Sequence, residues 1–278
     1  MKLAVISDIH IDEQEDELQF EELLAGCVNA SQADCLLVAG DISEHYERSL
    51  NFMDRISKKI RAKAYYCFGN HDLWSKHEAG LSVSTILKSA KSRGKGFIQN
   101  GAVFLDSKTV LVAGCGWYDY SFAFPGMFTK KELSGKEYMG RTWQDSLYAL
   151  HGKSDEEVCK EWNSELLSLV ESHADKNIVF MTHMVNHPAF LVGEDHKKYE
   201  MFRFFNGFMG SEGLYNISRH KSIKIAISGH VHYRKSFMEN STRYLCRCLG
   251  YPAEFPAFGG KPGLEDQIIS AMETIEIN

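Results

Sequence analysis

The sequence predicts an α/β fold built around parallel strands. In the first third of the chain, three short apolar segments alternate with two segments whose apolar residues recur at helical spacing. This strand–helix–strand–helix–strand order implies parallel strands, because each helix carries the chain back over the sheet by a right-handed crossover. Polar side chains that can bind metal follow the strands directly, at the sheet edge where open α/β folds bind their ligands.

The first three strands and two helices are read from apolar patterning. Strands are expected at Lys2–Ser7, Cys35–Ala39 and Ala64–Phe68. Continuous apolar runs of this length are typical of strands that are buried on both faces. Helices are expected at Glu15–Ala30 and Tyr46–Arg61, where apolar residues recur every three or four positions.

The rest of the chain predicts a second group of strands. A hairpin is expected where Ala102–Leu105 and Thr109–Ala113 flank the turn residues Asp106-Ser107-Lys108. The tail, Gln267–Ile277, alternates loosely and is expected to add an edge strand. Four more strands are expected between these segments, the last two as a hairpin: Asn177–Thr182, Ser222–Ser228, Lys235–Glu239 and Arg243–Cys248.

Composition restricts the class of protein. Of 278 residues, 44% are hydrophobic and 24% charged, which is ordinary for a globular domain, and no apolar run approaches the roughly 18 to 20 residues of a membrane helix. The N-terminus turns acidic too early for a secretory signal peptide, so we expect a cytoplasmic protein with reduced cysteines. A net charge of −6 gives no strong sign of nucleic-acid binding but is compatible with a small phosphorylated substrate.

Metal-binding residue types stand at the carboxyl ends of five expected strands. Alone, each is compatible with a turn or a helix cap, but five together predict one site. Gly-Asn-His-Asp, at 69–72, is expected by chance only roughly 0.002 times in this composition, and Gly-His-x-His, at 229–232, roughly 0.04 times. The residues are Asp8 and His10; Asp41; Asn70, His71 and Asp72; His183; and His230 with His232.

The chemistry of this set points to two metal ions. Carboxylate oxygen, amide oxygen and imidazole nitrogen, without thiolate, suit Mn, Fe or Zn. There are more candidate ligands than one ion needs. Two ions roughly 3.5–4 Å apart can stabilise the attacking and the leaving oxygen of a phosphoryl displacement.

In order and type, these blocks resemble the calcineurin-like metallophosphoesterase superfamily, over residues 8 to 232. The resemblance implies a four-layer α-β-β-α sandwich of two packed mixed sheets. It also implies a single domain over residues 1–278, with aromatic-rich, cap-like insertions at about 117–173 and 186–220.

The resemblance further implies roles for individual residues. A metal-bridging hydroxide would be the nucleophile, and no covalent enzyme intermediate is expected. His71 would be the general acid, with Asp72 holding its ring. The first ion would be held by Asp8, His10, Asp41 and His232, and the second by Asp41, Asn70, His183 and His230.

Differences between this chain and the known branches of the family narrow the range of expected substrates. Protein Ser/Thr phosphatases usually carry Gly-Asp-x-Val-Asp-Arg-Gly and Gly-Asn-His-Glu, where this chain has Gly40-Asp41-Ile42-Ser43 and Asp72. Purple acid phosphatases place a tyrosine where Glu44 stands. DNA-repair nucleases share Gly-Asn-His-Asp but usually have longer chains. We therefore expect a small phosphodiester or phosphomonoester; a nuclease, a protein phosphatase and a non-catalytic scaffold are the alternatives.

Aromatic residues are dense beside two of the motif blocks, at 117–128 and 199–209. Core packing is one interpretation. The other is a wall that contacts the substrate, with Trp117, Tyr118 and Phe205 as the candidate contacts.

Overall fold

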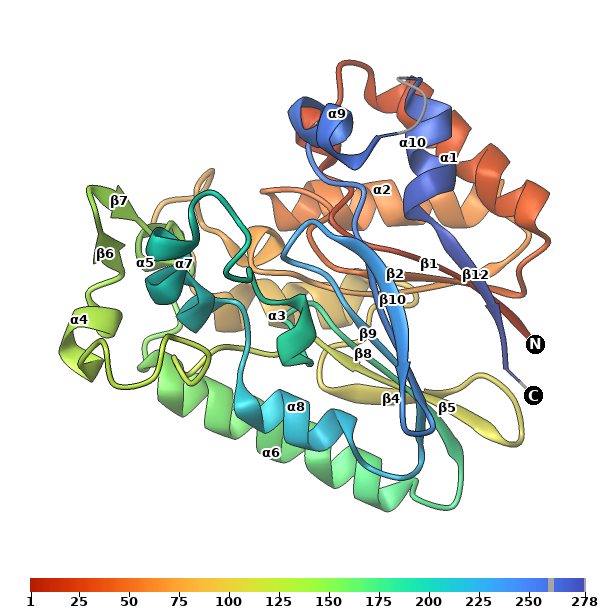
Figure 1. The fold of residues 1–278 in the computed structure, drawn as a ribbon. Helices are drawn as coiled ribbons and strands as arrows, with labels where there is room; N and C mark the ends of the chain where they lie inside the picture. Colours follow the sequence, from red (N-terminus) through yellow and green to blue (C-terminus); the bar gives the residue numbers. More distant parts are fainter. Residues whose placement is uncertain (260–262, 278) are drawn as a thin grey trace.

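The computed structural model describes residues 1–259 and 263–277. Two β-sheets pack face to face, and helices cover both outer faces (Figure 1). The chain is therefore the four-layer α-β-β-α sandwich of two mixed sheets that the resemblance implied.

The first sheet has the strand order β12-β1-β2-β3. Strands β1 (Lys2–Ile6), β2 (Cys35–Ala39) and β3 (Lys63–Cys67) are parallel, as their alternation with helices predicted. Strand β12 (Glu273–Glu276) pairs antiparallel with β1. The expected edge strand in the tail is thus confirmed, but it is shorter than predicted, because helix α10 (Leu264–Ala271) precedes it.

The second sheet has the order β10-β11-β9-β8-β5-β4. Its four central strands are parallel, and the two edge strands are antiparallel to their neighbours. A separate hairpin is formed by β6 (Glu137–Tyr138) and β7 (Arg141–Thr142). The strands of the second sheet are β4 (Gly101–Phe104), β5 (Thr109–Gly114), β8 (Asn177–Thr182), β9 (Ile223–Ser228), β10 (Arg234–Glu239) and β11 (Thr242–Arg247).

Helices form the outer layers (Figure 1). Helices α1 (Glu17–Ser31), α2 (Tyr46–Lys59) and α10 cover the first sheet, and α3 (Val83–Arg93) packs against α2. Helix α6 (Asp155–Ser172) packs against β5 and against α8 (Glu212–Ser218) on the second sheet. Four short helices are α4 (Lys130–Ser134), α5 (Asp145–Tyr148), α7 (Tyr199–Phe205) and α9 (Phe255–Phe258).

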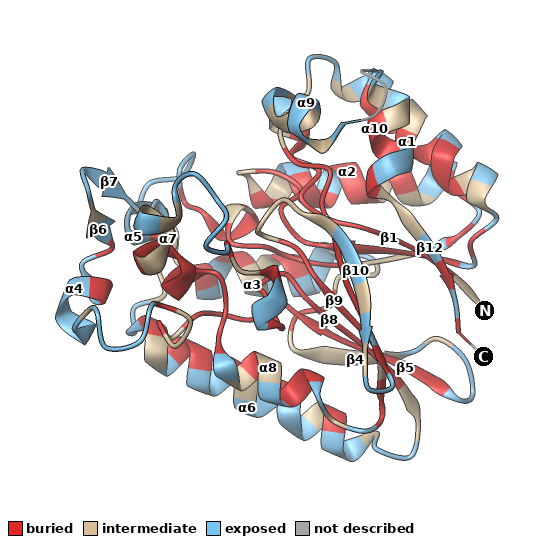
Figure 2. Cartoon of the chain, in the orientation of Figure 1, coloured by how far each residue is buried: buried red, intermediate tan, exposed pale blue. Residues whose placement is uncertain are grey.

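The apolar core lies in three layers, one between the β-sheets and one under each helical layer. Leu3 and Val5 of β1 face Val179 and Ile225 of the opposite sheet, while the intervening Ala4 packs under the helices. Figure 2 shows the central strands buried along most of their length, the edge strands more exposed, and the helices buried mainly on the face toward a sheet. Burial on both faces explains the continuous apolar strand sequences.

Within residues 1–259 and 263–277, no helix combines the length and the apolar composition that crossing a membrane requires.

The carboxyl ends of strands from both sheets open at one edge of the sandwich. The β6–β7 hairpin and α7, which come from the two aromatic-rich segments, line a cavity together with residues from these strand ends. Helix α6, although it lies within residues 117–173, belongs instead to the outer helical layer. The fold therefore brings distant segments together around the predicted ligands.

Candidate metal centre

The backbone turns sharply where the metal-binding residue types leave the strands. Left-handed conformations are uncommon for residues other than glycine, and each costs about 1–3 kcal/mol. Such conformations persist only where the surrounding structure holds them, and they gather at functional sites. They occur at five of the seven predicted ligands: Asp8 (φ 51°), His10 (φ 39°), Asp41 (φ 51°), His230 (φ 72°) and His232 (φ 50°).

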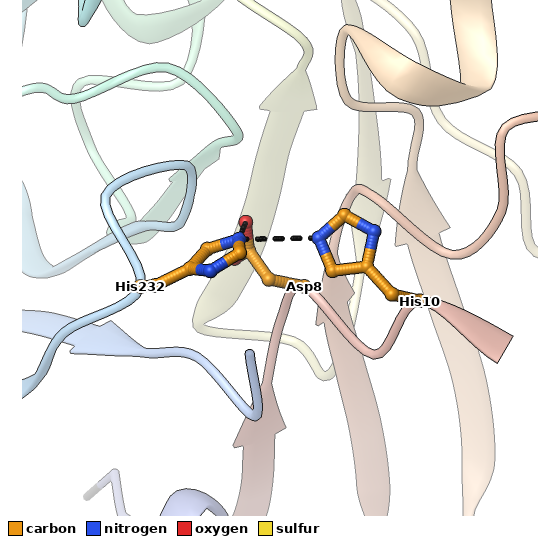
Figure 3. Close-up of side chains that lie close together, drawn as sticks. All are labelled: Asp8, His10 and His232. Carbon is orange, nitrogen blue, oxygen red and sulfur yellow. Dashed lines mark hydrogen bonds and ion pairs between the residues drawn. The ribbon is translucent and has the colours of Figure 1, made fainter. Parts of the chain in front are cut away.

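The first cluster consists of Asp8, His10 and His232 (Figure 3). The Nε2 atoms of His10 and His232 lie 3.1 Å apart. The Asp8 carboxylate lies 3.5 Å from Nε2 of His232 and also accepts the backbone N–H of His230 at 2.9 Å. The loop after β9 is thereby tied to the end of β1.

The second cluster consists of Asp41, His183 and His230, and Asn70 joins it. Nε2 of His183 lies 3.1 Å from Nδ1 of His230 and 3.0 Å from Oδ1 of Asn70. The Asp41 carboxylate lies 3.4 Å from the same Nε2 atom. Three strand ends of the first sheet and two of the second thus contribute to one group of side chains.

Asp41 stands between the two clusters. Its Oδ2 atom lies 3.9 Å from Nε2 of His10 and 3.9 Å from Nε2 of His71. Burial alone would raise the pKa of this carboxyl, but the neighbouring His183 and His71 rings hold it well below its usual range. A carboxylate in this position can be shared by two cations.

The donor set fits divalent cations. Imidazole nitrogens face each other at 3.1 Å in both clusters, and two unprotonated nitrogens repel unless a proton or a metal ion lies between them. Although burial lowers the pKa of His183, the Asp41 and Asp8 carboxylates raise it to about 10. These carboxylates therefore favour positive charge beside His183, and the oxygen and nitrogen donors suit Mn, Fe or Zn.

Further hydrogen bonds orient two of the four rings. Nδ1 of His183 lies 2.9 Å from the carbonyl oxygen of Ala39, and Nδ1 of His232 lies 2.6 Å from Oε2 of Glu254. These contacts leave Nε2 of each ring facing the centre, as in protein metal sites. Within the described residues, Nδ1 of His10 and Nε2 of His230 are buried without a hydrogen-bond partner.

Two motif glycines are explained by close approach. A Cβ atom on Gly69 would lie 2.1 Å from Oδ1 of Asp41, and one on Gly229 would lie 2.5 Å from Oδ2 of Asp8. Contacts this short are sterically excluded, so only glycine lets both carboxylates occupy their positions.

His71 lies at the edge of the centre, 15% exposed. Its ring stacks on Trp74 at a centroid distance of 3.8 Å, and its Nδ1 atom lies 3.8 Å from Oε1 of Glu44. The ring is therefore held in the cavity beside Asp41, from which a proton could reach a bound substrate.

Asp72 does not hold the His71 ring, so that expectation is wrong. Its carboxylate accepts the backbone N–H groups of Ile42, Ser43 and Gly69. Burial, together with the charge of Asp41, raises the pKa of Asp72 to about 7. Asp72 therefore ties the loop after β2 to the loop after β3, and it acts on the site through the backbone.

A cavity of about 600 Å³ opens over the centre. Trp117 and Tyr118 do not line it: both side chains are fully buried, and they bond to Asp155 and Asp145 inside the protein. The expectation that these two residues contact substrate is therefore wrong, and both pack in the core instead. Phe205 does line the cavity, and its contact with substrate stays a prediction.

The sequence patterns did not identify several residues that line the cavity. Trp74 and Trp143 line the cavity, and both donate to the buried carboxylate of Asp145. Tyr251 packs against the His10 ring at 4.5 Å, beside Glu254. No motif marks these positions; only the density of aromatic residues next to the motif blocks pointed toward the region.

Comparison with known proteins agrees with the geometry. The family model described as calcineurin-like phosphoesterase matches residues 1–234. No curated protein matched the sequence.

Solved structures share the fold. The phosphopantetheinyl hydrolase from Mycobacterium tuberculosis is similar over 99% of this chain and 95% of its own, with 17% identity and a TM-score of 0.76. A dimetal phosphatase from Danio rerio is similar over 88% of this chain and 86% of its own, with 15% identity and a TM-score of 0.51. At these identities the likeness concerns the fold alone.

We predict that Gly69→Ala reduces the metal content of the protein, because the added methyl group displaces the Asp41 carboxylate. Manganese bound per chain, measured by elemental mass spectrometry after dialysis against Mn²⁺, should fall clearly below the wild-type value. Gly26→Ala is the matched control, since nothing lies within 4 Å of its Cβ position in α1. Equal metal content in both variants would show that the carboxylate position does not matter.

Proposed function

Because this chain belongs to the calcineurin-like phosphoesterase family and is a metal-dependent phosphoesterase, we propose that it hydrolyses a small phosphoester with two metal ions. The observation that carries the proposal is the pair of buried clusters that meet at Asp41. One cluster would hold the first ion through Asp8, His10 and His232. The other would hold the second through Asn70, His183 and His230, and Asp41 would be shared.

Bound at these positions, two divalent cations would supply Lewis acidity that activates water and stabilises charge on the phosphoryl group. The protein's own part is to hold the ligands rigidly. Asp8, for example, is fixed by the His230 backbone N–H, and His183 by the Ala39 carbonyl. Ligands that are positioned in advance need no rearrangement during the reaction.

His71 is proposed to donate the proton to the leaving oxygen. Its ring is partly exposed in the cavity, and stacking on Trp74 limits its rotation. Glu44 lies beside Nδ1 at 3.8 Å, so Nε2 is the atom that faces the centre. A proton held on Nε2 is correctly placed for general acid catalysis.

The cavity indicates the kind of organic group that the phosphoester carries. One wall is apolar, with Trp143, Met201 and Phe205 among its residues. Arg141 lies at the same cavity and has no acidic partner among the described residues, whereas Lys76 pairs with Glu44. We therefore propose a substrate with an apolar portion against this wall and a negative group near Arg141.

The reaction class is tested with metal-stripped protein. Hydrolysis of bis-p-nitrophenyl phosphate and p-nitrophenyl phosphate should appear on addition of Mn²⁺ and disappear in Asp41→Ala. The ratio of the two rates distinguishes diesterase from monoesterase activity. Turnover that is independent of Mn²⁺, or that survives in Asp41→Ala, would contradict the proposal.

The effect of His71→Ala on kcat should depend on the leaving group. With alkyl phosphoesters, whose leaving oxygen needs a proton, kcat should fall by about 10²–10⁴-fold; with p-nitrophenyl esters the loss should be much smaller. Manganese content should stay at the wild-type value. The exposed His77 supplies the control variant His77→Ala, and equal losses on both substrate types would remove His71 from the acid role.

The apolar wall is tested with two diesters that share the p-nitrophenolate leaving group. In the wild type, the hexyl ester should have a lower KM than the methyl ester; in Phe205→Ala this advantage should shrink by roughly tenfold. Phe190→Ala is the control, because Phe190 is fully buried but does not line the cavity. An unchanged ratio of KM values in Phe205→Ala would exclude contact between the alkyl group of the substrate and Phe205.

A further inference from the structure

Asp145 is a buried carboxylate that connects the candidate metal centre to the cavity wall. It is the first residue of α5, only 1% exposed, and lies far along the chain from every motif block. Among the described residues, four side chains donate hydrogen bonds to it. Oδ1 accepts from Asn70 Nδ2 at 2.9 Å and Trp74 Nε1 at 2.7 Å; Oδ2 accepts from Trp143 Nε1 at 2.8 Å and Tyr118 OH at 3.1 Å.

The contact with Asn70 decides which end of the amide faces the metal centre. Because Nδ2 donates to Asp145, Oδ1 points toward Nε2 of His183 at 3.0 Å. An amide oxygen can bind a cation, whereas an amide NH₂ group cannot. Among the described residues, Asp145 is the side chain that accepts from the Asn70 NH₂ group and holds it away from the centre.

The two tryptophans extend the influence of Asp145 to the substrate side. Trp74 stacks on His71 at 3.8 Å, and Trp143 lies edge-on to His230 with ring centroids 5.7 Å apart. Trp143 also packs against Phe205, at 6.0 Å. One carboxylate thus contacts a predicted ligand, the support of the predicted general acid and the apolar wall.

We propose that Asp145 is a positioning residue, which orients Asn70 toward the second metal ion and fixes Trp74 and Trp143 around the substrate. This inference rests on the proposed function, since Asn70 is taken as a ligand there. Asp145 acts through these neighbours and touches neither metal nor substrate. The segment between β5 and α6 would then serve both as a wall of the cavity and as a support of the metal centre.

Asp145→Asn is the informative substitution, because a carboxylate accepts four hydrogen bonds and an amide cannot. If the NH₂ group of the new amide faces Asn70 and Trp74, it meets two donors. If it faces Trp143 and Tyr118, it can donate to the Tyr118 hydroxyl but meets the Trp143 N–H, whose ring lies beside His230. We expect one Mn²⁺ per chain to bind as in the wild type and the second to bind about 10 to 100 times more weakly, the usual effect of losing a contact behind a ligand. Isothermal titration calorimetry and elemental analysis measure this directly.

Asp155→Asn is a closely matched control. Asp155, the first residue of α6, is also buried, and it accepts from Trp117 Nε1 at 2.8 Å and Lys136 Nζ at 2.8 Å. None of the predicted metal ligands is among its partners. Its substitution should lower the melting temperature but leave both Mn²⁺ affinities unchanged.

The exchanged pair Asn70→Asp with Asp145→Asn provides a rescue. The amide introduced at position 145 would donate to the carboxylate introduced at position 70. The double variant should therefore bind the second Mn²⁺ more tightly than Asp145→Asn does and more tightly than the sum of the two single effects allows. If Asp145→Asn alone does not fold, the Mn²⁺ affinities of the double variant still test the positioning role of residue 145.

The outcomes separate the two proposals. If wild type binds two Mn²⁺ ions and turns over phosphoesters, but Asp145→Asn and Asp155→Asn have the same Mn²⁺ affinities, the positioning role is overturned and the proposed function stands. If wild type binds fewer than two ions, the proposed function itself fails. A selective loss of the second ion in Asp145→Asn, reversed in the exchanged pair, establishes the role.

Discussion

The buried carboxylate of Asp41 is the constraint on which the candidate centre depends. Three imidazoles, those of His10, His71 and His183, lie within 4 Å of it. A charge removed from water must be compensated by close, well-ordered partners. The two sheets supply this order, because His10 and Asp41 follow strands of one sheet while His183 follows a strand of the other. The packing of the two sheets against each other therefore brings the residues of the candidate centre together.

The same geometry explains why the site residues adopt strained conformations. Asp8, Asp41 and His230 leave their strands with positive φ angles, and each such residue costs stability. Rigid strands buried on both faces can sustain this cost, since the apolar core between the sheets is continuous. A flexible loop would relax instead, and the converging nitrogens and oxygens would separate.

Two carboxylates that hydrogen-bond to predicted ligands come from parts of the chain outside the sequence motifs. Asp145 lies in the segment between β5 and α6, and Glu254 follows β11, beyond the residues matched by the family model. Each contacts one predicted ligand: Asn70 in the first case and His232 in the second. Segments outside the motif blocks thus help to orient the predicted ligands as well as to shape the cavity.

The sequence by itself determined the order of strands and helices, the three parallel strands of the first sheet and the residue types of the candidate ligands, because apolar periodicity and short motifs are local properties. Tertiary structure decided what local patterns do not encode. Trp117 and Phe205 have similar aromatic surroundings in the sequence, yet one is core and the other lines the cavity. Asp72 follows His71 directly but turns its carboxylate to the backbone of another loop. Asp145 meets Asn70 across 75 residues, a contact that exists only once the strands are packed, since long-range neighbours are set by the three-dimensional path of the chain.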